Sequence, residues 1–71
     1  MNMQTPHDWN WEAWRGRLTH LLGLTETRYD LSHGEILLAT GTAPQDLHEL
    51  WSYGWTPGEA AAVITEALGL R

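Results

Sequence analysis

One helix ends and another begins within the stretch Tyr53-Gly54-Trp55-Thr56-Pro57-Gly58-Glu59. Glycine readily adopts the left-handed conformation that closes a helix, so Gly54 predicts a helix end with Trp55 folding back over the last turn. Thr56 and Glu59 have the spacing of a capping box, in which a hydroxyl and a carboxylate each accept a backbone amide at a helix start. The stretch therefore predicts two helices joined by a tight turn.

The same two signals recur along the rest of the chain. Three further hydroxyl residues are each followed three positions later by an acid or an amide, as at a helix start: Thr5, Ser32 and Thr42. Three further glycines stand where a helical pattern stops: Gly23, Gly41 and Gly69. Together they predict helices near residues 6–22, 33–40, 43–53 and 57–68, with one longer connection over residues 24–31.

No stretch alternates apolar and polar residues over the length of a strand, and apolar residues make up 42% of the chain. The expected fold class is therefore all-α, a compact bundle of about four short helices in a single domain over residues 1–71. The 3.6-residue period places an apolar stripe on each helix and predicts the core. Its expected members are Trp11, Trp14, Leu18, Leu21, Leu22, Leu31, Ile36, Leu37, Leu47, Leu50, Trp51, Ala60, Ala61, Ile64, Ala67 and Leu68.

The chain carries nine acidic residues against four arginines and no lysine, a formal net charge of −5. The imbalance lies in residues 30–71, where Arg71 is the only such cation, whereas residues 1–29 are neutral. A nucleic-acid partner needs a basic surface, so the charge argues against one. It favours a protein partner with a basic surface, because opposite charges speed encounter.

The chain has neither a long apolar run nor a basic region followed by an apolar core at its N-terminus. We therefore expect no membrane span, no signal peptide and a cytoplasmic location. Cysteine is absent, and no two histidines have the spacing of a helical metal-binding motif. The sequence also lacks a nucleophile motif and a glycine-rich phosphate loop. We expect no metal, no cofactor and no enzymatic activity.

A second stripe on the first predicted helix is a candidate partner-binding surface. It consists of Trp9, Ala13, Gly16 and His20, which lie opposite the core face at helical spacing. A glycine inside a helix costs about 1 kcal/mol relative to alanine, and tryptophan is a favoured anchor at interfaces. The stripe is thus expected to face a partner protein or a second copy of the chain. Two alternatives stay open: Trp9 precedes the regular helix and covers the core, or the other three helices wrap both sides of this one.

Acidic stripes on the two later helices are the other candidates. Asp46, Glu49 and Tyr53 share one face of the third predicted helix, and Glu59 and Glu66 share one face of the fourth. As binding residues, Asp46, Glu49 and Tyr53 would attract a basic patch on a protein partner. As the alternative, these are solvated faces that keep a tryptophan-rich protein in solution.

Residues 47–64, with Gly54-Trp55-Thr56-Pro57 between two helices, resemble a helix-turn-helix. They are also similar to the glycine-aromatic turn of ubiquitin-associated domains. The helix-turn-helix resemblance implies a DNA-binding regulator. Its recognition helix over residues 57–68 would contain two glutamates and no arginine or lysine, which disfavours reading of a major groove.

A further resemblance covers residues 11–36. The tryptophan-rich first helix, Leu22-Gly23-Leu24, Tyr29 and the helix start at Ser32 are similar to small tail-assembly chaperones of phages and gene-transfer agents. The chain departs from that pattern after residue 41. The resemblance implies a role as an assembly chaperone or structural component.

These observations favour a small acidic protein-binding module, an inhibitor or adaptor of a larger protein, of the kind that phages and mobile elements encode. The alternatives are a tail-assembly-type chaperone or structural component and, disfavoured by charge, a helix-turn-helix-like regulator.

Overall fold

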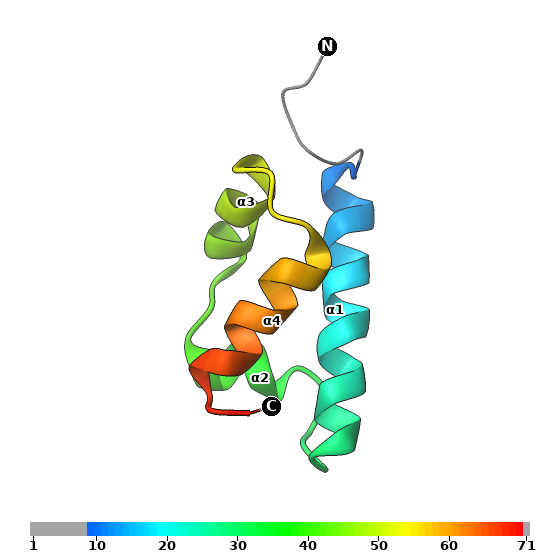
Figure 1. Cartoon of the computed structure of the whole chain (residues 1–71), viewed down its shortest axis with the longest axis vertical. Coiled ribbons are helices and arrows are strands. Elements are labelled where there is room, and N and C mark those ends of the chain that lie inside the picture. The colour runs from blue at the N-terminus through cyan, green and yellow to red at the C-terminus, as the bar shows by residue number, and fades with distance from the viewer. Residues whose placement is uncertain (1–8, 71) are drawn as a thin grey trace.

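The computed structural model describes residues 9–70 of the chain. Within them lie four helices and no strand: α1 (Trp11–Arg28), α2 (Glu35–Thr40), α3 (Pro44–Ser52) and α4 (Pro57–Ala67). The predicted all-α class is therefore confirmed. α1 runs along one side of the molecule, with α3 beside its first turns and α2 nearer its end, and α4 packs mainly against α1 (Figure 1).

The core lies where α4 meets α1, and α2 and α3 complete it. Its buried apolar residues all belong to the predicted core: Trp14, Leu18, Leu22, Ile36, Leu47, Ala60, Ala61 and Ile64. The small side chains of Ala60 and Ala61 allow α4 to approach α1 closely. Ala67 was also expected there and is exposed, because it is the last residue of α4 and the buried face stops one turn earlier, at Ile64.

α1 begins and ends later than predicted. The described part of the helix starts after Asn10, whose side-chain oxygen accepts the amide of Ala13 at 2.8 Å, and the predicted start at Thr5 lies outside the described residues. The predicted end at Gly23 is wrong, since the helix continues to Arg28. Glycine weakens a helix but does not necessarily end it. The part of α1 that follows Gly23 includes Glu26, whose side chain is buried.

The chain leaves α1 after Arg28 through Asp30, which adopts φ 60°. The amide of Leu31 donates to the Glu26 carbonyl at 2.7 Å, and the amide of Asp30 donates to the Thr27 carbonyl at 3.2 Å. This pair of hydrogen bonds defines a Schellman motif. α2, α3 and α4 end with the same pair, at Gly41, Gly54 and Gly69. Three of the four predicted glycine ends are thus confirmed, whereas the end of α1 uses aspartate, which tolerates positive φ better than most residues.

The start of α2 differs from the predicted capping box. The helix begins after Gly34, and the hydroxyl of Ser32 caps no amide. Only the return half of the box forms, in which Glu35 Oε1 accepts the Ser32 amide at 2.9 Å. The carboxylate of Glu26 on α1 supplies the missing cap, because its two oxygens accept the amides of Gly34 and Ile36, each at 3.0 Å.

The starts of α3 and α4 follow the sequence signals more closely. Thr56 and Glu59 form both halves of the predicted box at α4, at 3.1 and 3.0 Å. At α3 the predicted box of Thr42 is displaced by one residue: Ala43 stands at the N-cap, and Asp46 Oδ2 accepts its amide at 2.9 Å. Alanine has no acceptor, so this box is half formed.

Candidate functional site

A cluster of aromatic rings joins the start of α1 to α3. Trp11 lies at its centre, with ring centroids 5.9 Å from Trp14, 5.8 Å from Trp51 and 4.9 Å from His48. The guanidinium of Arg15 lies 6.0 Å from the Trp11 ring on the outer side. We call Trp11, Trp14, His48 and Trp51 the aromatic cluster. It fixes the two helices relative to each other, and so fixes the surface that they present.

Two indole N–H groups of this cluster tie down the connecting segments. Trp14 donates to the backbone carbonyl of Trp55 at 2.6 Å, and Trp51 donates to the carbonyl of Trp9 at 2.9 Å. A buried indole N–H needs such an acceptor. The first bond holds the turn before α4 against α1, and the second holds the residue before α1 against α3.

The predicted stripe on α1 does not form one helical surface. Trp9 precedes the N-cap Asn10, so it lies outside the helix, and its side chain is 38% exposed. Ala13, Gly16 and His20 lie on α1 and are exposed. A Cβ added at Gly16 would meet nothing within 4 Å. The alternative that the other helices cover this side of α1 is therefore wrong, and a partner contact here stays a prediction.

The predicted acidic stripe on α3 is exposed, but its members differ in what they do. Asp46 caps α3, as described above, so its carboxylate has a structural role. Glu49 is exposed and forms no ion pair among residues 9–70. Tyr53 is 74% exposed at the end of the helix. Binding of a partner by this stripe is likewise a prediction.

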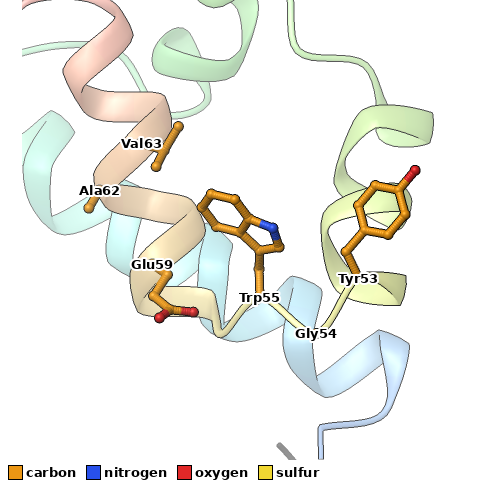
Figure 2. Close-up of a pocket in the computed structure, with 6 residues that line it drawn as sticks. All are labelled: Tyr53, Gly54, Trp55, Glu59, Ala62 and Val63. Atoms are coloured by element: carbon orange, nitrogen blue, oxygen red, sulfur yellow. The ribbon is translucent and has the colours of Figure 1, made fainter. Parts of the chain in front are cut away.

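A groove opens beside Tyr53, between the turn that follows α3 and the outer side of α4. It is lined by Tyr53, Gly54, Trp55, Glu59, Ala62 and Val63 and has a volume of about 510 Å³. Gly54 makes the turn possible, because it is buried and has φ 91°. In Figure 2 the ring of Trp55 lies between Tyr53 and the Val63 side of α4. We call this site the Trp55 groove.

The groove combines apolar walls with polar groups that the chain itself does not use. Among residues 9–70, no acceptor lies within hydrogen-bond distance of the Trp55 indole N–H. One oxygen of Glu59 accepts the Thr56 amide, and the other has no partner in the described part of the chain. The exposed ring of Tyr53, the half-buried ring of Trp55 with its free N–H donor, and the free carboxylate oxygen of Glu59 can together bind a side chain that is both apolar and basic.

Sequence reasoning identified Tyr53 and Glu59 but missed Trp55, Ala62 and Val63. The signal that could have found Ala62 and Val63 is their position as an apolar pair on the polar side of α4, three and four residues after Glu59. Val63 is 46% exposed, which the helical period also indicates.

Other classes of site find no support in the described residues. No group of three or more metal-binding side chains occurs within residues 9–70. No helix in that range is both long enough and apolar enough to span a bilayer. Comparison of the chain with known protein families, curated proteins and solved structures finds no match.

Proposed function

We propose that this protein is an acidic protein-binding module, an inhibitor or adaptor that acts in the cytoplasm by occupying a basic surface of a larger protein. One observation carries the proposal. Tyr53 and Val63 are large apolar side chains exposed on the part of the chain, residues 29–70, that contains no arginine or lysine. Exposed aromatic and aliphatic side chains gather at protein interfaces, and a surface of one charge selects a partner of the opposite charge.

The charge also gives the expected manner of association. The surface acids speed encounter with a basic partner, while the apolar side chains hold the complex once it has formed. At physiological ionic strength a charge is screened over about 8 Å, so the steering depends on salt.

The charge of α4 argues against a DNA-binding regulator. The second helix of a helix-turn-helix enters the major groove. The corresponding helix, α4, carries Glu59 and Glu66 and no cation, so it would repel the phosphate backbone.

The experiment is affinity purification of the tagged chain from its native host, with mass spectrometry of the proteins that co-elute. We expect one larger protein with a basic surface, bound at low salt and released at about 1 M salt, where the screening length falls to about 3 Å. Neighbouring genes distinguish the variants of this role: phage structural genes favour an assembly chaperone, and defence genes favour an inhibitor. Recovery of no protein partner under either salt condition contradicts the proposal.

A further inference from the structure

Two glutamates bracket an apolar patch on the exposed side of α4. Glu59 and Glu66 are two helical turns apart, and Ala62 and Val63 lie between them at positions i+3 and i+4, so the four share one side of the helix. All four residues are exposed. Among residues 9–70 neither glutamate forms an ion pair. This side of α4 therefore offers apolar area with a negative charge at each end.

The Trp55 groove adjoins this patch, since Glu59, Ala62 and Val63 line it. Figure 2 shows the indole ring beside Val63, with the ring nitrogen on the side of Tyr53. The groove thus extends the apolar area sideways from α4 and adds an unused N–H donor. Ala62 is small enough for another backbone to approach α4 here.

We propose that the α4 face and the Trp55 groove bind a basic amphipathic helix of the partner protein. Its arginine or lysine side chains, two turns apart, pair with Glu59 and Glu66, because two helices lying side by side have the same rise per turn. Leucine-sized side chains between them cover Ala62 and Val63 and enter the groove beside Trp55. This inference rests on the proposed function and specifies its site and the chemistry of its partner.

A second copy of the chain is a poorer occupant. Two α4 faces would oppose glutamate to glutamate. The arginines within the described residues all lie on α1, at positions 15, 17 and 28, and no two of them have the spacing of neighbours on one helix face or of two turns. Arg15 also lies against the Trp11 ring. Residues 9–70 therefore contain no pair of arginines that matches the charge pattern of α4.

The test uses a synthetic helical peptide as the probe, with two arginines seven positions apart and leucines three and four positions after the first arginine. A control peptide has glutamate in place of both arginines. Titration calorimetry with the full chain should give micromolar binding of the arginine peptide and none of the glutamate peptide at about 1 mM. In two-dimensional NMR spectra the indole N–H signal of Trp55 should move on binding, whereas that of Trp51, which is bonded to the Trp9 carbonyl, should not.

The chain offers a matched pair of variants for the second arm. Glu66→Arg and Glu49→Arg each reverse an exposed acid in the last turn of a helix, α4 or α3, where a basic residue suits the helix dipole. Both variants should therefore keep or raise the melting temperature. Glu49 belongs to the predicted stripe on α3 and not to the α4 face or the lining of the Trp55 groove, so the pair also compares these two surfaces. Glu66→Arg should weaken peptide binding at least tenfold, and Glu49→Arg less than threefold. Glu59 is left unchanged because it caps α4.

Val63→Thr tests the apolar part of the same face, since it keeps the shape of the side chain and replaces one methyl group with a hydroxyl. It should weaken binding by about threefold to tenfold without loss of helicity.

Four results would overturn the inference: equal weakening by Glu66→Arg and Glu49→Arg, equal affinity for the two peptides, no binding of either at about 1 mM, or sedimentation of a dimer that Glu66→Arg dissociates. The proposed function fails separately. If a native partner is captured equally by the wild type and by Glu66→Arg, the protein is still a binding module, but the α4 face is not its binding site.

Discussion

Helices α2 and α4 carry the same capping signal in the sequence but are held at their starts by different groups. At α4, Thr56 and Glu59 satisfy each other's amides as the signal predicts. At α2 the hydroxyl of Ser32 takes no part, and the carboxylate of Glu26, two residues before the end of α1, accepts two amides instead. One start depends only on its own residues, and the other depends on a residue brought from a neighbouring helix.

The two helix starts differ because different acceptor groups lie within hydrogen-bond distance of their first amides. At the start of α4 both capping hydrogen bonds are exposed, and the side chains of Thr56 and Glu59 are the available acceptors. α2 begins close to the last turn of α1, since the Glu26 carboxylate reaches its first amides. Glu26 is only 3% exposed. A carboxylate with a net charge is a stronger acceptor than a hydroxyl and also suits the positive end of a helix. At α2 the buried carboxylate of Glu26 therefore replaces the cap that the sequence signal at Ser32 predicts.

The largest expected effect comes from Glu26→Gln, which breaks the start of α2. The amide keeps one acceptor oxygen but turns its NH₂ group toward a backbone amide, so one buried N–H loses its partner and the charge at the helix start is lost. The free energy of unfolding should fall by about 2 kcal/mol. Urea unfolding followed by far-UV circular dichroism measures it.

Glu12→Gln is the control, because it changes the same functional group in the first turn of α1 at an exposed position. It should cost less than about 1 kcal/mol. Equal losses from the two variants would show that Glu26 is an ordinary surface acid and that the comparison of the two helix starts is mistaken.

Thr56→Ala has the next largest effect, at the start that depends on local residues. It removes the hydroxyl that accepts the Glu59 amide, and loss of such a cap costs about 1 kcal/mol. Thr19→Ala, an exposed threonine within α1, should be neutral or slightly stabilising in the same urea titration. A neutral result at Thr56 would place the start of α4 elsewhere.

Gly23→Ala should change stability in the opposite direction. Because Gly23 lies inside α1, alanine should raise the free energy of unfolding by about 0.5–1 kcal/mol through its helix propensity. The new methyl group would meet the His33 ring at an ordinary contact distance of 3.8 Å. If Gly23 instead ended the helix in a left-handed conformation, the same change would destabilise the protein. The sign of the shift in the urea midpoint therefore tests whether α1 reaches Glu26.

Much of the fold could be predicted because its signals are local. Helical spacing identified the buried residues Trp14, Leu18 and Ile64, and glycine identified the ends of α2, α3 and α4. The end of α1 could not be read in this way. It depends on the positive φ of Asp30 and on the buried hydrogen bonds between Glu26 and the start of α2. Glu26 and Ile36 are too far apart in the sequence for a short motif to indicate this contact.

The candidate site was predictable to a smaller extent. Periodicity placed Glu59 and Glu66 on one exposed side of α4, and exposure of Tyr53 agrees with its expected position. Trp55 was missed as a groove residue because its sequence position indicates only the turn after α3. Its position in the fold also depends on the hydrogen bond from Trp14 to its backbone carbonyl, a contact between distant parts of the chain.

Ser32→Ala should have the smallest effect on stability, and it is the most direct test of the difference between the starts of α2 and α4. A complete capping box at this residue would make Ser32→Ala cost about 1 kcal/mol. In the structure the residue contributes only its backbone, as its amide donates to Glu35 and its carbonyl accepts the Glu35 amide at 3.0 Å. Alanine keeps both bonds, so the free energy of unfolding should change by less than about 0.5 kcal/mol. Glu35→Ala removes the acceptor that the structure does use and should cost more than Ser32→Ala in parallel urea titrations. The reverse order would mean that the hydroxyl caps α2 after all and that Glu26 is not the group that holds its start.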